Sequence, residues 1–506
     1  MPRRAADGYV RRRWANAVLV GQTDRVPRLT GLDASFLYLE TPAMHMHVCF
    51  VAVLDPSTMP VEYSFESLRT HIAGRVPLIA PFGRVLRSVP LQVHHPVWVD
   101  DADFDIEHHV HRVELGVAGR HARIEGGDLH QLSRVAGEIA SVPLDRSRPL
   151  WDLTIVEGMD DGRLGLVIKV HHSAMDGSAG IEILYALFDL EPDPPSDTES
   201  DLADADGPPE PIDDPSNLEL LSQATRDRLR ATAGVGALVR RTGEAVTGVA
   251  RARSGDSGPG AGTPLDAPHT PFNGAIGPAR DLAFARVSLD EVKQVKQAFG
   301  VTVNDVVLAL CARTLRRYLL ERDALPEAPL LASCPVSIRV EGETGVYGNK
   351  VSVMFTRLPT DVDDPAQCLQ VAGAMANAAK AEQRRLGASL LGDWAEIADP
   401  RSLSWATDQL SRFGLADHLP PVHNVVISNV AGPAFPVYLA GARLEQGYPM
   451  GPVLEGAGLN ITVLSYIDTV DIGFIASPNL VPDLWALAGD VAPAFAELVG
   501  LLEPAE

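Results

Sequence analysis

The sequence predicts a mixed α/β protein made of two α+β-like halves, each built around a mixed sheet. Its length of 506 residues exceeds what one ordinary hydrophobic core organises, so two domains are expected. Residues 191–215 (EPDPPSDTESDLADADGPPEPIDDP) are rich in proline and acid and divide the chain. Strand and helix patterns occur on both sides of this break without a repeating βα order, which favours mixed sheets.

The break and its flanks define four segments. Residues 1–27 are expected to be disordered, because their short, interrupted apolar run makes a poor signal peptide. Residues 28–190 and 281–503 form the two domains. Residues 191–280 join them through the acidic stretch, a basic amphipathic helix and a stretch rich in glycine and proline. This helix either bridges the domains or lies on a membrane or lipid-droplet surface, since arginines flank its modest apolar face.

Hydrophobic patterning identifies four further elements. LGLVIKV (164–170) and NVVISNV (424–430) read as short buried strands. SAGIEILYALFDL (178–190) and VNDVVLALCARTLRRYLLER (303–322) read as helices, the second with its arginines largely opposite an apolar face. The first strand and the first helix enclose the most distinctive motif of the chain.

Composition excludes some classes of function. Hydrophobic residues make up 46% and charged residues 22%, as in ordinary globular proteins. The formal net charge of −23 argues against nucleic-acid binding but leaves local membrane contact open. We expect a cytoplasmic protein, with peripheral contact to the inner membrane face or to lipid droplets as an alternative, because no apolar run of about 18 residues occurs. The cysteines are scattered and are expected to be free, buried thiols: Cys49, Cys311, Cys334 and Cys368.

Two adjacent histidines follow the strand at 164–170. In extended chain His171 and His172 point to opposite sides, so one can hold the loop while the other faces a cleft. An imidazole titrates near neutral pH, and a cleft-facing one could take a proton from a hydroxyl or thiol. The residues alone leave a second interpretation open, a packed histidine pair in the core.

Asp176 and Gly177 follow the histidines at a tight turn. The carboxylate can accept backbone N–H groups and fix the shape of the loop, so its first expected role is structural and its second is catalytic. No metal site is expected. The other histidine clusters, HMH (45–47), VHHP (93–96) and EHHVH (107–111), lack acidic or cysteine partners at metal-ligand spacing and are expected at the surface or at strand edges.

HHSAMDG (171–177) matches the HHxxxDG motif of the CoA-dependent acyltransferase superfamily, which includes chloramphenicol acetyltransferase and the condensation domains of peptide synthetases. From about residue 28 to 503 the chain resembles the bacterial wax ester synthase/diacylglycerol acyltransferase family. The matching segments occur in family order: LTGLDASFLYLETPAMHMHV (29–48), PLDRSRPLWDLTIVEG (143–158), PFNGAIGPAR (271–280), VNDVVLALCARTLRRYL (303–319), CPVSIR (334–339), GNKVSVMFTRLPTD (348–361), ISNVAGP (427–433) and GLNITVLSYIDTVDIGF (458–474).

The resemblance implies two domains similar to chloramphenicol acetyltransferase with a tunnel between them. It makes His172 the general base that deprotonates an acceptor hydroxyl, and His171 a support for the loop. It also implies that Asp176, beside Gly177, pairs with an arginine, for which Arg339 is our candidate. Asn304 falls near the active site of the family, where it would hold the loop or stabilise the oxyanion; as an alternative it caps the following helix.

Two further motifs have supporting roles. Pro149, Leu150 and Trp151 are expected to pack the catalytic strand rather than to touch substrate. The segment that contains Ser428, Asn429 and Gly432 would line the tunnel, mark a crossover between the domains, or form a plain turn.

The resemblance implies an acyl-CoA-dependent O-acyltransferase that makes triacylglycerol from diacylglycerol, and wax esters from long-chain alcohols. Its partners would be long-chain acyl-CoA as co-substrate, the lipid alcohol, and a lipid surface, with no cofactor and no nucleic acid. Two alternatives stay open. One is a condensation-type ester synthase that takes its acyl group from a carrier protein, and the other is a catalytically weak paralogue that binds lipid droplets.

Overall fold

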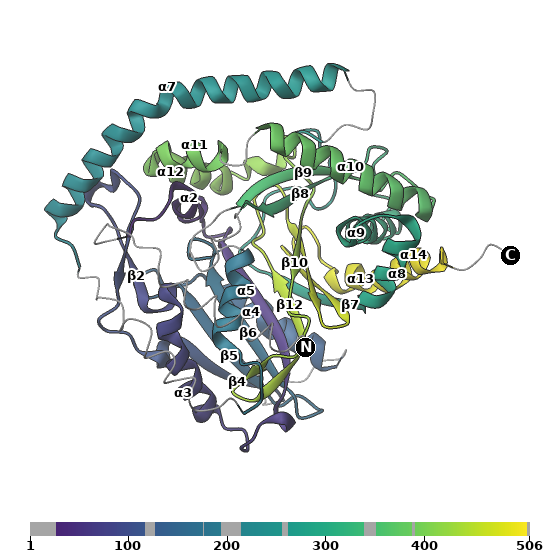
Figure 1. Ribbon diagram of the computed structural model, residues 1–506, viewed down its shortest axis with the longest axis horizontal. Helices are drawn as coiled ribbons and strands as arrows, with labels where there is room; N and C mark the ends of the chain where they lie inside the picture. The colour runs from purple at the N-terminus through teal and green to yellow at the C-terminus, as the bar shows by residue number, and fades with distance from the viewer. Residues whose placement is uncertain are drawn as a thin grey trace, which may run out of the picture.

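Two six-stranded sheets form the centres of two lobes that lie side by side (Figure 1). The computed structural model describes residues 27–116, 127–175, 177–193, 214–255, 262–338, 351–386 and 390–502. Asp176 and Arg339 lie outside these residues. The fold is mixed α/β, as the sequence predicts.

The N-terminal lobe contains a sheet in the order β11-β12-β1-β6-β5-β4. Helices α3 and α5 pack on one face of this sheet and α4 packs on the other. The elements of this lobe are α2 (Gly31–Leu39), β1 (His47–Asp55), α3 (Phe65–Arg75), β2 (Arg84–Arg87), β3 (Val97–Asp100), β4 (Val110–Glu114), α4 (Asp128–Ala140), β5 (Trp151–Glu157), β6 (Leu164–His171) and α5 (Gly177–Leu187).

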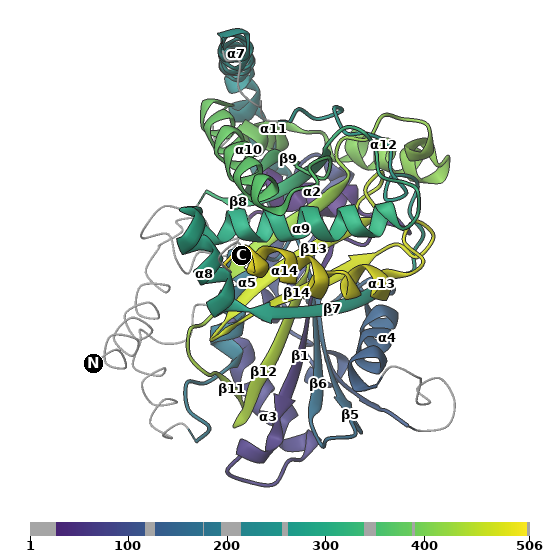
Figure 2. The same cartoon turned by 90° about the vertical axis from the view of Figure 1, so that its right-hand side faces the viewer.

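The C-terminal lobe contains a sheet in the order β7-β14-β13-β10-β8-β9. Helices α8, α9, α13 and α14 lie together against this sheet (Figure 2) and share with it the largest apolar core of the molecule. The elements are β7 (Asp281–Ser288), α8 (Leu289–Phe299), α9 (Val303–Leu320), β8 (Leu330–Ser337), β9 (Val351–Leu358), α10 (Pro365–Leu386), α11 (Leu390–Ile397), α12 (Pro400–Arg412), β10 (Val425–Ala431), β13 (Leu459–Tyr466), β14 (Thr469–Ala476), α13 (Leu484–Gly489) and α14 (Val491–Gly500).

The predicted strands and helices occur where the sequence places them, as β6, β10, α5 and α9. Helix α9 is more deeply buried than its pattern suggests. Arg313, on its polar side, is only 7% exposed and donates through Nε to Glu497 at 2.7 Å. Ion pairing therefore allows a charged helix face to pack inside the lobe.

The chain crosses between the lobes after β10. Strands β11 (Tyr438–Leu439) and β12 (Ala442–Met450) join the sheet of the N-terminal lobe, where β12 pairs antiparallel with β1. The register aligns Cys49 with Met450. The first sheet thus contains strands from both halves of the sequence, a pairing that depends on tertiary contacts and has no local signal.

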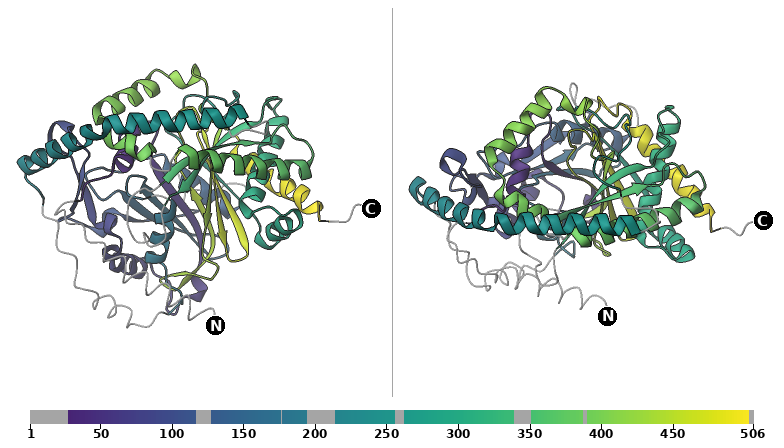
Figure 3. Two further views of the ribbon diagram at one scale, coloured as in Figure 1. Left: turned by 45° about the horizontal axis from the view of Figure 1, so that its top comes forward. Right: turned by 90° about the horizontal axis from the view of Figure 1, so that it is seen from above.

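A long helix, α7 (Asn217–Gly255), occupies the position of the predicted amphipathic helix and spans both lobes (Figure 3). Leu220 packs with Val89 and Val97 of the N-terminal lobe. At the other end, Thr242 accepts a hydrogen bond from the Trp394 indole at 3.0 Å. These contacts favour the bridging interpretation of the helix.

Helices α11 and α12 reach from the C-terminal half onto α2 of the N-terminal lobe. The N–H of Gly31 donates to Oε2 of Glu396 at 2.6 Å, at the start of α2. A Cβ atom at Gly31 would lie 2.2 Å from the backbone nitrogen of Glu396, so this approach requires glycine. Helix α2 is thus clamped from the far half of the chain.

Within the described ranges, no one helix has both the length and the apolar character needed to cross a membrane.

Candidate active site

The histidine pair lies at the end of β6, between strands that fix its backbone. All eight residues of β6 are buried, and His171 is aligned with His47 of β1. The N–H of His171 donates to the carbonyl of Leu150 at 3.0 Å, and that of His172 donates to the carbonyl of Met46 at 2.7 Å. Both peptide units are therefore held from opposite sides where the strand leads into the loop.

The two rings lie in different environments, as the alternation of a strand predicts. His171 is 1% exposed. His172 is only half-buried, and its ring stacks on Phe36 of α2 with a centroid distance of 4.1 Å and an interplanar angle of 13°. The stack restricts rotation of the His172 ring while leaving part of it accessible.

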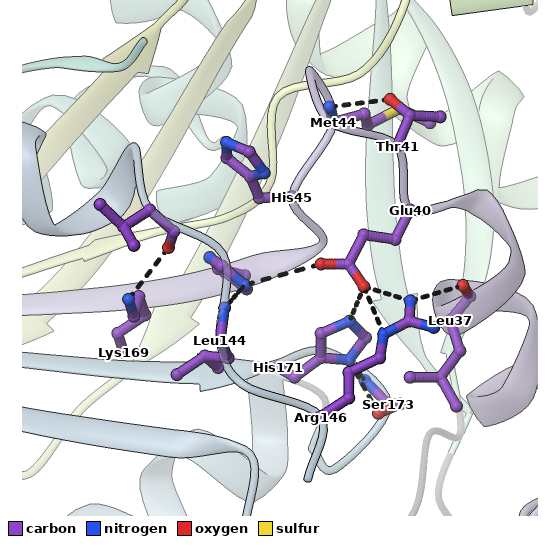
Figure 4. Close-up of polar contacts among 12 residues, drawn as sticks. Leu37, Glu40, Thr41, Met44, His45, Leu144, Arg146, Lys169, His171 and Ser173 are labelled. Atoms are coloured by element: carbon purple, nitrogen blue, oxygen red, sulfur yellow. Dashed lines mark hydrogen bonds and ion pairs between the residues drawn. The ribbon is translucent and has the colours of Figure 1, made fainter. Parts of the chain in front are cut away.

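The tautomer of His171 follows from its hydrogen bonds (Figure 4). Nδ1 accepts the backbone N–H of Ser173 at 3.1 Å, so the ring proton of the neutral form is on Nε2. Nε2 lies 3.5 Å from Oε2 of Glu40, the residue that ends α2. Burial lowers the pKa of His171 and outweighs the attraction of the Glu40 carboxylate. His171 is therefore neutral near pH 7.

Glu40 is the centre of this network. Burial alone would raise its pKa, but the His171 ring and the Arg146 guanidinium outweigh burial and lower it. Arg146 forms a bidentate contact with Oε2 of Glu40, and it also donates to the carbonyl of Leu37 at 2.8 Å. An ionised carboxylate thus links α2, the loop before β5 and the end of β6.

Further buried polar groups surround this network. Nε2 of His47 accepts the N–H of Leu144 at 3.3 Å, and burial holds the pKa of His47 well below its usual range. Lys169 is 3% exposed and donates to the carbonyls of Ile139 and Val142 at 3.2 and 3.1 Å. The ends of β1 and β6 are therefore fixed by hydrogen bonds on the side away from His172.

The histidine clusters expected at the surface are largely buried, which corrects that prediction. His45, His47, His94, His95 and His109 are each at most 5% exposed. Their partners come from distant segments: Nδ1 of His95, for example, lies 2.9 Å from the Tyr38 hydroxyl, and Nδ1 of His109 lies 2.8 Å from the carbonyl of Trp151. Sequence spacing does not reveal such partners.

The structure places the remaining predicted residues in three groups. Trp151 is fully buried, stacks on Phe82 and donates to its carbonyl at 3.0 Å, and Leu150 is 1% exposed, so this motif packs beside β6. Pro149 is also buried. Gly177 begins α5, directly after the loop. Asp176 and Arg339 belong to the part of the chain that is not described, so their pairing stays a prediction.

Asn304 lies at the start of α9 but does not cap it, which corrects the alternative interpretation. The cap is Thr302, whose side chain accepts the N–H of Asp305 at 3.2 Å in a capping box. Nδ2 of Asn429 donates to Oδ1 of Asn304 at 3.4 Å, so α9 and β10 meet at this pair. Thr302 satisfies the helix end because its hydroxyl stands one position before the first helical residue.

Ser428, Asn429 and Gly432 lie at the end of β10, where the chain leaves the C-terminal sheet for the N-terminal one. Gly432 donates its N–H to the carbonyl of Ser465 at 2.9 Å. A Cβ atom at Gly432 would lie 2.6 Å from that carbonyl oxygen, so the close contact of the crossover needs glycine here.

Sequence reasoning missed three residues of the network: Phe36, Glu40 and Arg146. Phe36 and Glu40 lie in the segment 29–48 and Arg146 lies in 143–158, and both segments point to the family rather than to these side chains. Glu40 is 106 residues from Arg146, and no motif links them. Among the described residues, no group of three or more histidine, cysteine, aspartate or glutamate side chains could hold a metal ion.

Comparison with known proteins identifies the chain. Residues 29–307 match the wax ester synthase/diacylglycerol acyltransferase catalytic domain, and residues 347–499 match the C-terminal domain of the same family. A Mycobacterium tuberculosis protein provisionally named diacylglycerol O-acyltransferase is 37% identical over 484 residues, which cover 93% of this chain and 90% of that protein.

Solved structures agree with this assignment. The wax ester synthase/diacylglycerol acyltransferase from Marinobacter aquaeolei VT8 matches with a TM-score of 0.64 and 26% identity, over 94% of this chain and 99% of that one. The starter condensation domain of rhizomide synthetase shares the fold, with a TM-score of 0.52 and 12% identity over 95% of each chain.

The fold and the histidine motif thus define an acyltransferase. The chain belongs to the wax ester synthase/diacylglycerol acyltransferase family.

Proposed function

We propose that the protein transfers a long-chain acyl group from acyl-CoA to the free hydroxyl of diacylglycerol and so makes triacylglycerol. A long-chain alcohol would serve as a second acceptor and give a wax ester. The family and the name of the 37% identical relative support diacylglycerol as the main acceptor. The observation that carries the chemistry is the accessible, stacked His172 beside a buried, neutral His171.

His172 acts as the general base in this proposal. It removes the proton of the acceptor hydroxyl while the oxygen attacks the thioester carbonyl carbon. The C–S bond of the tetrahedral intermediate then breaks, and the CoA thiolate takes the proton back from His172. The sequence of steps is balanced without a metal, a redox cofactor or an acyl-enzyme, so acyl-CoA is the only co-substrate that it needs.

Glu40 is a positioning residue in this proposal. Its carboxylate faces the Nε2 proton of His171, and Ser173 occupies the other ring nitrogen, so His171 is held in one orientation. His171 and His172 share a peptide bond, so this anchor also fixes the backbone that carries the base. Outside the described residues, Asp176 and Arg339 would hold the far side of the loop.

Asn304 and Asn429 are our candidates for the opposite wall of the site. Asn429 donates to the carbonyl oxygen of the Asn304 amide, which leaves the amide N–H groups of Asn304 to serve as oxyanion donors. Replacement of a single donor of this kind typically costs about a hundredfold in turnover.

Product analysis tests the proposed function. Purified protein would receive palmitoyl-CoA with dioleoylglycerol or hexadecanol, offered separately, and released thiol and lipid product would both be measured. We expect thiol release that depends on the acceptor, with triacylglycerol as the main product. Release that does not require an acceptor would show a thioesterase instead. Transfer only from an acylated carrier protein would favour the condensation-type alternative.

A further inference from the structure

Exposed apolar side chains concentrate on one short stretch of the C-terminal half. Of the fifteen large apolar residues that are well exposed in the described chain, six lie between residues 394 and 422. They include every tryptophan and phenylalanine in that set. We define the α12 patch as the five that lie on α12 or directly after it: Trp405 (68% exposed), Phe413 (65%), Leu415 (39%), Leu419 (50%) and Val422 (46%).

The patch begins on the outer side of α12, a helix whose inner side is firmly packed. Leu403 packs against the small core formed around α2, and Thr407 is buried with its hydroxyl bonded to the carbonyl of Leu403 at 2.9 Å. Asp399 caps the helix by accepting the N–H of Ser402 at 3.0 Å. The exposure of Trp405 and Phe413 is therefore a property of a well-anchored helix.

The segment that carries the patch has no net formal charge. Residues 400–422 contain two arginines and two aspartates and are formally neutral, in a chain whose net charge is −23. Arg412 pairs with Asp408 at 3.4 Å, and Asp417 accepts the N–H of Ala275 at 2.7 Å. A net-negative protein with a neutral apolar face is suited to a lipid surface with neutral headgroups and is repelled by an anionic one.

Helix α2 connects the α12 patch to the proposed base, His172. Thr41 directly follows Glu40 in the chain. Its hydroxyl lies 3.4 Å from the hydroxyl of Ser411, near the end of α12. Helix α2, which ends at Leu39, carries Phe36, and the ring of Phe36 stacks on that of His172. Between α2 and α12 a cavity of about 150 Å³ is lined by Tyr38, Arg146 and Ser404, among others.

We propose that the α12 patch docks on a lipid surface with neutral headgroups and so brings the His172 site to a water-insoluble acceptor. The inference rests on the proposed function for the identity of that acceptor, whereas docking itself needs no catalysis. Exposed tryptophan, phenylalanine and leucine side chains on an anchored helix and the segment directly after it are the kind that enter a lipid interface. Arg401 and Arg412, near the two ends of α12, are exposed, and side chains of this length can reach phosphate or ester oxygens.

The test is flotation of the full chain with phosphatidylcholine vesicles that contain dioleoylglycerol. The variant Trp405→Ser/Phe413→Ser should bind these vesicles at least about tenfold more weakly than the wild type. Val61→Ser/Val142→Ser removes two other exposed apolar side chains and should bind like the wild type. Binding should not increase with phosphatidylserine and should be the same in low and high salt.

Three outcomes would overturn the proposal. Equal flotation of the patch variant and the wild type would show that the patch does not contact lipid. Binding that requires phosphatidylserine and is lost in high salt would point instead to the basic helix α7. Dissociation of a wild-type dimer by Trp405→Ser/Phe413→Ser, measured by sedimentation without lipid, would make the patch an interface between two copies of the chain.

Thiol release separates this proposal from the proposed function. With dioleoylglycerol in vesicles the patch variant should be slower than the wild type, whereas with hexanol dissolved in water the two rates should agree within about twofold. A wild type that floats but transfers to neither acceptor would end the proposed function and leave docking supported. Equal slowing with both acceptors would show that the variant damages the site and would contradict a docking role.

Discussion

The two lobes stabilise similar sheets by different means. In the N-terminal lobe, buried histidines fill the core next to the strand ends, whereas the C-terminal lobe has an almost wholly apolar core around α9. Among the described histidines, burial lowers the pKa of six in the N-terminal lobe and of one in the C-terminal lobe. The six are His45, His47, His94, His95, His109 and His171, and the one is His423.

This difference assigns a role to each lobe. Neutral imidazoles and the ionised Glu40 position the backbone of His172, so the N-terminal lobe carries the proposed base. The C-terminal lobe supplies a rigid apolar frame, and it contributes β11 and β12 to the other sheet. Its α12 rests on α2, beside the site.

Truncation of one aromatic residue in each core would test this division most strongly. Trp151→Ala and Phe272→Ala both remove a fully buried ring and should each lower the free energy of unfolding by about 3–5 kcal/mol. Only Trp151→Ala should also lower the turnover of the protein that remains folded, because Trp151 pairs with Val170 beside the histidines. Denaturant unfolding and thiol release would be measured on both. Equal loss of turnover would remove the distinction between the lobes.

Replacement of Glu40 by glutamine tests the anchor of His171. Glu40→Gln keeps the size of the side chain but removes the charge that faces His171 and Arg146, and turnover should fall about a hundredfold. Stability should fall by only about 1–2 kcal/mol, since the Arg146 side chain is 48% exposed.

Glu445→Gln is the matched control for this variant. Glu445 pairs with Arg163 and Arg443 at the other end of the sheet. Its replacement should therefore leave turnover unchanged. If the two glutamine variants turn over equally fast, Glu40 has no positioning role.

Acid should destabilise the N-terminal lobe first. The folded-state pKa of its buried histidines lies below the ordinary value of 6.5, so below pH 6.5 the unfolded chain binds protons that the folded lobe does not. The stability that depends on neutral histidines in the folded lobe is fully present above pH 6.5 and is lost as the pH falls. The melting temperature should therefore drop by about 5 °C between pH 8 and pH 5.5.

Hydrogen exchange would locate this effect. Peptides from β6 should lose protection at a higher pH than peptides from β13. Simultaneous loss in both strands would show that the two lobes do not differ in their response to acid.

The ion pair of the C-terminal core should matter least. Arg313→Met leaves Glu497 without this partner, but Glu497 is 27% exposed and keeps its contact with Arg317. We expect a loss of about 1 kcal/mol in unfolding free energy and unchanged turnover. A large fall in turnover, measured by thiol release, would mean that the frame is coupled to the site.

Sequence patterning predicted local features and missed distant partners. The strand that carries His171 and the helix that starts near Asn304 follow from runs of apolar residues, which act over a few positions, whereas the cap of that helix is Thr302 and not the expected Asn304. The contact of Glu40 with Arg146 and His171, and the pairing of β12 with β1, join segments far apart in the chain. Burial of the other histidines depends on such partners too, which explains why their exposure was predicted wrongly.

The most direct test of the account is the turnover of His172→Ala beside that of His108→Ala, both measured by acceptor-dependent thiol release from palmitoyl-CoA. His108 is exposed and distant in sequence from the motif, so its replacement controls for loss of a histidine. The account predicts a loss of about a thousandfold for His172→Ala with an unchanged melting temperature, and full turnover for His108→Ala. Turnover of His172→Ala within a few-fold of the wild type would contradict the assignment of the base.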